Sequence, residues 1–132
     1  MKKKQTLFTI LTLLALIDAV YASKENSRSF QYYCQQNSQD TQSQKKYTFI
    51  STIFTVNPRY ANYCYEANLK RHENKFENYL SREYDHLNIE NGIATCFCFK
   101  MRSSAIKNYR INVNRLRSTS ELKLYLIRTF PN

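Results

Sequence analysis

The spacing of four cysteines constrains the fold of this chain more than any other feature of its sequence. They are Cys34, Cys64, Cys96 and Cys98. In an oxidising compartment, an even number of cysteines in a chain of this size indicates disulfides. Cys96 and Cys98 are separated by one residue, and a bond between them would close a cramped ring. We therefore expect each of these two to pair with Cys34 or Cys64, which leaves two connectivities open.

The N-terminus has the organisation of a secretory signal peptide. Met1 to Lys4 is positively charged, and a mostly apolar run from Leu7 to Ile17 follows it. This run is shorter than the roughly 20 apolar residues that span a bilayer, and Ala19-Val20-Tyr21-Ala22 after it suits cleavage. No later segment is apolar enough to span a membrane. We expect residues 1–22 to be removed and residues 23–132 to form one secreted, extracellular domain.

The expected mature chain is basic and rich in aromatic residues. It carries 17 Lys plus Arg against 9 Asp plus Glu, which gives a net charge of +8. Ten tyrosines and seven phenylalanines remain after processing, whereas the whole chain has a single glycine, Gly92, and two prolines. So few turn-forming residues are untypical of a β-sandwich or a knottin, and they favour long helices.

The first half of the chain contains one clear helix signal and two weaker segments. Asn57-Pro58 predicts the start of a long helix, because Asn caps helices and Pro fits their first position. We expect this helix to reach about Tyr84 and a turn to follow at Asn91-Gly92. Before it, residues 30–34 predict a short helix, while residues 47–56 fit either a helix or a strand.

The second half predicts further helices. Four apolar residues recur at helical spacing, and they are Ile106, Tyr109, Val113 and Leu116. Ser118 followed by Glu121 resembles a capping box before another helix. Cys96-Phe97-Cys98 is ambiguous: in a helix the two cysteines would lie about 200° apart and would bond to elements on both sides, whereas in a strand they would share a face.

We favour the helix for this segment and predict an all-α fold, a compact bundle of four or five helices stapled by two disulfides. The alternation of residues 93–101 also fits a strand. A small α+β disulfide domain is therefore the alternative.

Two short segments place a cysteine between aromatic residues, Tyr63-Cys64-Tyr65 and Phe97-Cys98-Phe99. Cys96-Phe97-Cys98 resembles one of the paired Cys-Tyr-Cys motifs of the bicycle proteins, which are secreted salivary effectors of aphids and their relatives. The other motif corresponds to Asn62-Tyr63-Cys64, which lacks its leading cysteine. The resemblance covers about residues 60–109. It implies a non-enzymatic effector, delivered in saliva, that binds and modulates a host plant macromolecule.

The aromatic residues of these motifs have an alternative role. They are Tyr63, Tyr65, Phe97 and Phe99. Aromatic rings provide large apolar surfaces for packing, so these side chains would also serve to fill the core around the disulfides.

Few residues suggest catalysis, and no nucleophile elbow, phosphate loop or metalloprotease helix occurs. A ribonuclease-type hydrolase could use His72 and His86 as base and acid, with Lys70, Arg71 or Lys75 stabilising the charged phosphate. However, His72 lies in a polar run that is typical of a solvated helix face. Zinc binding by the histidines and the two close cysteines would require reduced thiols. We predict no enzymatic activity, no metal and no cofactor.

Basic residues dominate the C-terminal third, where only Glu121 opposes them. A possible binding face comprises Lys100, Arg102, Lys107, Arg110, Arg115 and Arg117, and Lys123 and Arg128 follow it. Such a surface attracts phosphate backbones, anionic lipids, acidic polysaccharides or acidic proteins, although it also serves simply as a solvated face. No nucleic-acid recognition motif accompanies it. We predict that the partner is a host protein or an acidic macromolecule. A further alternative is that the chain itself is a membrane-active defence protein.

Overall fold

The computed structural model describes residues 29–57, 64–90 and 92–131. The expected signal peptide and Tyr63 lie outside these residues. Five strands, two helices and a short 3₁₀ helix follow one another along the described chain: β1 (Phe30–Gln39), β2 (Lys46–Ser51), β3 (Phe54–Val56), α2 (Glu66–Glu83), η1 (Asp85–Leu87), β4 (Ala94–Phe99), α3 (Arg102–Arg117) and β5 (Leu122–Ile127).

The strands form one mixed sheet around β1. Strand β4 pairs antiparallel with one side of β1, and β2 and β3 pair antiparallel with the other side, one after the other. Strand β5 extends the sheet by pairing parallel to β2. Because parallel neighbours need a crossover connection, the chain between β2 and β5 passes over the sheet.

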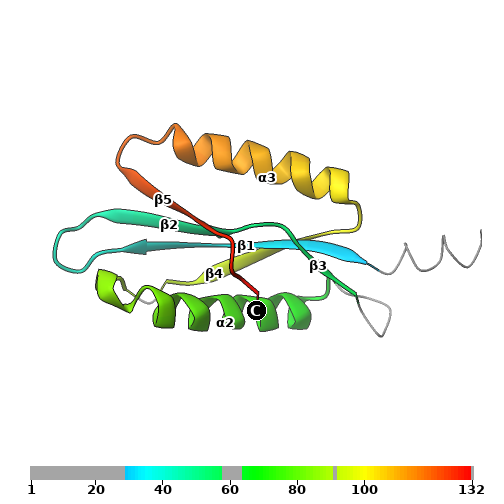
Figure 1. The fold of residues 1–132 in the computed structure, drawn as a ribbon, viewed down its shortest axis with the longest axis horizontal. Helices are drawn as coiled ribbons and strands as arrows, with labels where there is room; N and C mark the ends of the chain where they lie inside the picture. The colour runs from blue at the N-terminus through cyan, green and yellow to red at the C-terminus, as the bar shows by residue number, and fades with distance from the viewer. Residues whose placement is uncertain (1–28, 58–63, 91, 132) are drawn as a thin grey trace, which may run out of the picture.

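The two helices cover opposite faces of this sheet, as Figure 1 shows with α3 above it and α2 below it. Side chains alternate between the faces of a strand, so Cys34 of β1 lies in the α2 layer and Tyr33 in the α3 layer. On the α2 side, Phe76 and Leu80 pack on the sheet. On the α3 side, Val113 and Leu116 do so. The fold is therefore a three-layer α+β domain.

The all-α prediction is wrong. Residues 30–34 belong to β1, Cys96-Phe97-Cys98 lies in β4, and the segment after Ser118 forms β5. The helix predicted from Asn57-Pro58 to about Tyr84 exists as α2, but it begins only at Glu66. The predicted helix over residues 106–116 is confirmed as part of α3. Of the two fold classes considered from the sequence, the small α+β disulfide domain is the one observed.

The hairpin between β1 and β2 explains why the scarcity of glycine was misleading. The carboxylate oxygen Oδ1 of Asp40 accepts hydrogen bonds from the backbone N–H groups of Gln42 and Ser43, at 2.7 and 2.8 Å. Gln44 then adopts a positive φ of 60°. Side-chain hydrogen bonds from Asp stabilise such turns, so this hairpin needs no glycine.

The supposed capping box after α3 has a different role. Ser118 is the C-cap of α3, and its hydroxyl donates a hydrogen bond to the carbonyl oxygen of Arg115 at 2.7 Å. Ser118 therefore ends one helix instead of starting another, and the apolar residues after it continue into β5.

Both disulfides lie on the face of β4 that α2 covers. Cys34 and Cys96 occupy opposite positions on β1 and β4 and form one bond, and Cys64 and Cys98 form the other. This is one of the two connectivities that the sequence left open. The register of the strands explains it, because Cys34 lies opposite Cys96. Residues two apart in a strand share a face, so Cys98 points toward the same layer and pairs with Cys64.

The outer edge of β4 is covered by two glutamates of α2. Oε1 of Glu77 accepts a hydrogen bond from the N–H of Ala94 at 2.9 Å, and Oε1 of Glu73 accepts one from the N–H of Cys96 at 3.2 Å. An edge strand otherwise presents unpaired backbone groups that template pairing with another chain. The carboxylates occupy two of these groups and also fix α2 against the sheet.

The chain returns to the α2 layer after β5. Phe130 is buried there, with its ring 4.9 Å from that of Phe76 and 5.6 Å from those of Phe54 and Tyr79, measured between centroids. Within the described residues, no helix has the length and apolar character needed to cross a lipid bilayer.

Candidate functional site

The basic residues of the C-terminal third gather on α3. Helix α3 buries Ala105, Val113 and Leu116 and contains no acidic residue. Its five basic residues are all exposed, as is Lys100 just before the helix: they are Arg102, Lys107, Arg110, Arg115 and Arg117. The sequence prediction of an exposed basic segment therefore corresponds to one continuous helix on one side of the sheet.

These charges are not neutralised within the described part of the chain. The one salt bridge found there joins Lys70 and Glu73 of α2 at 3.9 Å. Arg102 donates a hydrogen bond to the side-chain oxygen of Gln31 at 3.2 Å, and Arg115 donates one to that of Asn112 at 2.9 Å. Both acceptors are neutral amides, so the two guanidinium groups keep their full positive charge.

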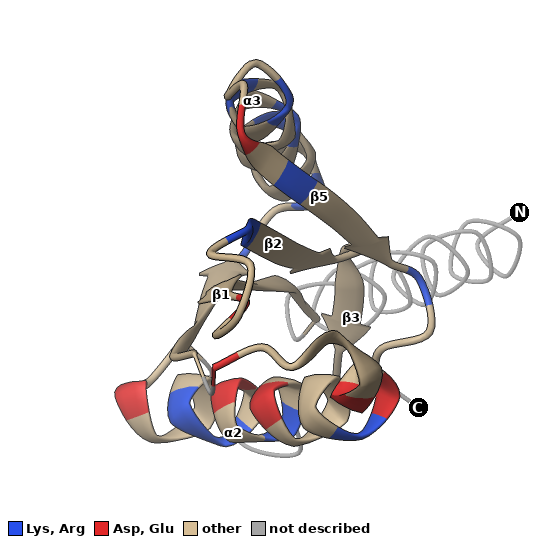
Figure 2. Cartoon of the chain, turned by 90° about the vertical axis from the view of Figure 1, so that its left-hand side faces the viewer, with Lys and Arg blue, Asp and Glu red and all other residues tan. Residues whose placement is uncertain are grey.

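Charge is distributed unequally between the two helical layers. Residues 64–90, which include α2, contain six acidic and four basic residues, whereas residues 100–131, which include α3, contain eight basic residues and one acidic residue. Figure 2 shows this contrast, with several red, acidic positions along the ribbon of α2 and few near α3. An anionic partner would therefore be attracted toward the α3 side.

A shallow hollow on α3 adds apolar contacts to this surface. It is lined by Ser103, Ile106, Lys107, Arg110 and Ile111. Ile111 is 60% exposed. Two cationic groups beside two isoleucines can contact a molecule that carries both negative charge and apolar surface.

Lys123 does not belong to this surface. Leu122 and Leu124 pack in the α3 layer, so alternation along β5 directs Lys123 to the other face of the sheet. There its ammonium nitrogen lies 5.2 Å from the centre of the Tyr125 ring. Residues close in sequence are thus divided between the two sides.

Tyr33 anchors α3 to the sheet beneath the basic residues. Its ring lies 4.8 Å from that of Phe97 and meets the edge of Tyr109 at 5.2 Å. Its hydroxyl donates a hydrogen bond to Oδ1 of Asn108 at 2.6 Å. Burial raises the pKa of the Tyr33 hydroxyl, although a hydrogen bond with Asn112 opposes the shift. Tyr33 therefore stays protonated and holds the helix in position.

The motif aromatics are divided between core and surface. Phe97 and Phe99 pack around Tyr33 in the α3 layer, which agrees with the core-filling alternative. Tyr65 is 62% exposed and precedes α2. Tyr63 lies outside the described residues. The rings of Tyr65, Phe97 and Phe99 therefore do not form one recognition surface.

The two histidines are not brought together. His72 is half-buried, with its ring centre 4.9 Å from that of Tyr32 and 5.7 Å from that of Phe54, while His86 is exposed in η1. From His72 to the end of α2 at Glu83 the helix rises roughly 16 Å. An acid and a base must both reach the reacting group within hydrogen-bond distance, so the geometry does not support a hydrolytic pair.

The conditions for the zinc site considered from the sequence are also not met. All four cysteines form disulfides. Across residues 29–57, 64–90 and 92–131, no group of three or more His, Cys, Asp or Glu side chains is placed to hold a metal ion.

Comparisons of this chain with protein-family models, with curated proteins and with solved structures found no match. The candidate surface therefore has to be interpreted from its own chemistry.

Proposed function

We propose that this protein is a secreted, non-enzymatic binding protein of the effector type that holds an anionic host macromolecule on the surface of α3. The observation that carries the proposal is a helix with five exposed basic residues, no acidic residue and no salt bridge to a described acidic residue. The two disulfides support an extracellular setting, because such bonds persist in oxidising environments.

The chemistry of the surface suits phosphate, sulfate or carboxylate groups. Arginine presents a planar fork of donors that binds such groups through two parallel hydrogen bonds. Lys107 and Arg110 would supply charge, and Ile111, which follows Arg110 in the same hollow, would supply apolar contact. Binding of this kind weakens as salt increases, because ions screen exposed charges.

The proposal that the host is a plant rests on the motif resemblance. The cysteines of Cys96-Phe97-Cys98 are both oxidised, and the signal peptide expected at residues 1–22 would direct export. The helical fold that was expected together with the resemblance is not present. The support for saliva-borne delivery into plant tissue is therefore this short motif together with the expected secretion signal.

The proposal can be tested by capture experiments with charge-reversed variants. The oxidised protein, immobilised, is exposed to plant tissue extract and to polygalacturonate, RNA and anionic vesicles as defined anionic probes. The test variant is Lys107→Glu/Arg110→Glu on α3. The matched control is Arg71→Glu/Lys75→Glu, which changes the net charge equally on exposed positions of α2.

We expect the α3 variant to lose at least about tenfold in affinity for its partner, while the α2 variant stays within about threefold. Equal weakening in both variants would indicate attraction by net charge alone and would contradict a binding surface on α3. Leakage of anionic vesicles would favour the membrane-active alternative instead. Phosphodiester cleavage that requires both His72 and His86 would favour the hydrolase alternative.

A further inference from the structure

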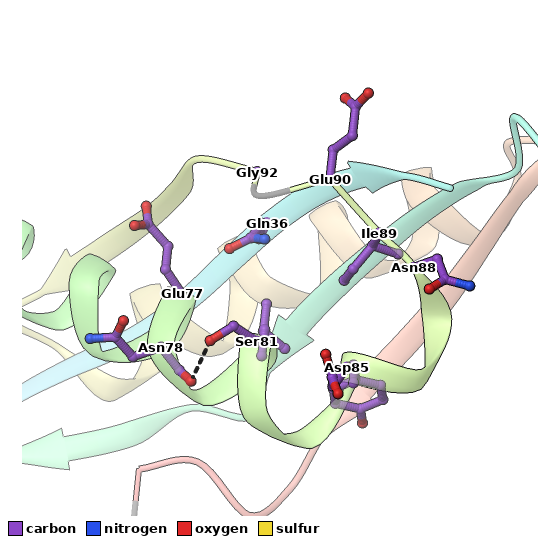
Figure 3. Close-up of a pocket in the computed structure, with 11 residues that line it drawn as sticks. Gln36, Glu77, Asn78, Ser81, Asp85, Asn88, Ile89, Glu90 and Gly92 are labelled. Carbon is purple, nitrogen blue, oxygen red and sulfur yellow. Dashed lines mark hydrogen bonds between the residues drawn. The ribbon is translucent and has the colours of Figure 1, made fainter. Parts of the chain in front are cut away.

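A groove on the α2 side of the molecule has a character opposite to that of α3. It lies between α2, η1, β1 and the segment that leads into β4, and its volume is about 410 Å³. Figure 3 shows its lining side chains. Ligand pockets commonly fall between about 300 and 1,000 Å³, so the groove is large enough for a small organic molecule or a side chain.

The groove is acidic in a basic protein. Glu77, Asp85 and Glu90 line it, and no Lys or Arg is among its lining residues. The whole chain has a formal net charge of +10. Glu77 uses Oε1 to accept the hydrogen bond from Ala94, which leaves its second oxygen available to a ligand. The three carboxylates come from α2, η1 and the following loop, so the fold gathers them from separate segments.

A second and independent feature is the buried amide of Gln36, which lines the same groove from β1. Gln36 is 4% exposed. Its nitrogen Nε2 donates a hydrogen bond to the hydroxyl of Ser38 at 3.1 Å, but Oε1 accepts none from any described residue. Buried polar atoms nearly always have a hydrogen-bond partner. This oxygen therefore points to a donor on a bound molecule.

Gly92 lets the segment before β4 pass close to β1 beside Gln36. A Cβ atom at this position would lie 2.4 Å from the carbonyl oxygen of Asn37 and 3.0 Å from Cγ of Gln36. No side chain could therefore occupy this place without displacing backbone. The only glycine of the sequence thus sits where the segment before β4 passes closest to β1 at the groove.

The acidic lining favours a cationic ligand that donates hydrogen bonds. A bare metal ion is a poor fit, because the described residues place no three carboxylate, imidazole or thiolate groups close enough to hold one. An ammonium group donates three hydrogen bonds and accepts none, which matches a lining dominated by acceptors. Leu80, Tyr84 and Ile89 supply an apolar wall for its alkyl chain.

We propose that this groove binds a primary ammonium group on an alkyl chain, with Oε1 of Gln36 as an acceptor of one of its hydrogen bonds and with the carboxylates of Glu77, Asp85 and Glu90 supplying the negative charge that attracts it. The ligand is either a free alkylamine or the lysine side chain of another protein. The groove lies on the side of the sheet opposite to α3 and does not depend on the function proposed above.

Calorimetric titration of the oxidised protein tests the proposal. The probes are 1,4-diaminobutane for a free amine and the peptide acetyl-Gly-Lys-Gly-amide for a lysine side chain, with 1,4-butanediol and magnesium chloride as controls. The test variant Asp85→Asn/Glu90→Gln removes two charges while preserving shape. Glu66→Gln/Glu83→Gln removes two charges from exposed positions of α2 that do not line the groove.

We expect saturable binding of at least one amine probe. The groove variant should weaken it at least about tenfold and the control variant at most about twofold, because attraction between charges falls with distance and the carboxylates of the groove lie nearer to a bound ammonium group. Diamine binding identifies a small amine as the source, and binding of the peptide alone identifies a lysine side chain. Absence of saturable amine binding, equal weakening in both variants, or equally tight binding of the diol or magnesium would overturn the proposal.

A measurement on the unmodified protein covers the case in which the groove variant does not fold. On addition of the amine that binds, the side-chain amide signal of Gln36 in a ¹⁵N-correlated NMR spectrum should shift in proportion to saturation. Saturable amine binding that leaves this signal unchanged would place the amine elsewhere and refute the site.

Discussion

Replacing the two glutamates that cover the edge of β4 should destabilise the protein far more than their position on a surface helix suggests. In Glu73→Ala/Glu77→Ala, the N–H groups of Ala94 and Cys96 lose their acceptors. Both residues are buried, with exposures of 2% and 5%. In the native fold the two carboxylates thus take the place of water at these N–H groups, and after the substitution water replaces the lost acceptors only in part.

The magnitude follows from the two hydrogen bonds. A hydrogen bond to a charged group contributes about 1.5–3 kcal/mol, so losing both should cost roughly 3–4 kcal/mol once some rehydration of the edge is allowed for. Glu73 also forms the 3.9 Å ion pair with Lys70, whose side chain is 57% exposed. A pair of that kind adds less than about 1 kcal/mol. Alanine favours helices, so α2 itself should persist.

Urea unfolding at pH 7 measures the effect. The matched control is Glu66→Ala/Glu83→Ala, which removes two exposed glutamates of the same helix without breaking a described hydrogen bond. We expect the control to lose at most about 1 kcal/mol. The edge variant should also dimerise or aggregate in size-exclusion chromatography, because its strand edge is open. If the free energies of unfolding of the two variants lie within about 0.5 kcal/mol of each other, the carboxylates do not stabilise the edge.

Three further results are expected. Reducing the disulfides should lower the free energy of unfolding by several kcal/mol, since removing one native bridge from a small secreted domain costs about 2–5 kcal/mol; unchanged thermal melting after confirmed reduction would refute this. Burial, with the charges of Lys75 and Arg71, lowers the pKa of His72. The contribution of His72 to the free energy of unfolding should therefore be fully present above the ordinary histidine pKa of about 6.5 and should be lost as the pH falls below it. In His72→Phe this part of the pH dependence of unfolding should vanish, and its persistence would assign it to another group. Tyr33→Phe loses the hydrogen bond to Asn108 and should cost about 1 kcal/mol in chemical denaturation, whereas a neutral result would show that the hydroxyl does not help to anchor α3.

The helices were more predictable from the sequence than the strands. In α3, apolar residues at helical spacing face the sheet, so the periodicity directly reports the packing. The residues of β4 have the alternating pattern of a strand. Its two close cysteines, however, are also compatible with a helix whose disulfides join it to elements on both sides. The choice depended on where the partner cysteines lie in space, which no local pattern encodes.

The sparse turn residues led to the wrong fold class for a physical reason. Two of the four connections between strands pass through a helix, and β2 leads directly into β3 on the same side of β1, so the described strands need only one tight β-hairpin, between β1 and β2. That hairpin depends on the side chain of Asp40 and on Gln44 in a left-handed conformation. A chain with a single glycine can therefore form a five-stranded sheet.

The two candidate sites differed in how far the sequence revealed them. The basic residues near the C-terminus are close together in the sequence, and their exposure follows from the spacing of the helix. The acidic groove combines Gln36 of β1 with Glu77 of α2, Asp85 of η1 and Glu90 of the loop. These residues come together only because α2 lies across the sheet, so the groove had no signature in the sequence.

The positions of the cysteines also divide the molecule into a part that is covalently cross-linked and a part that is not. Both disulfide rings close within residues 34–98, and α3 and β5 lie after Cys98. A peptide bond cut inside the rings would leave the fragments tethered, whereas a cut just before α3 would leave its helix and β5 attached by side-chain and sheet contacts alone. No disulfide therefore holds the basic helix on the sheet, whereas α2 and the acidic groove lie within the cross-linked residues. The part of the protein proposed to hold the partner thus keeps its place through noncovalent packing alone.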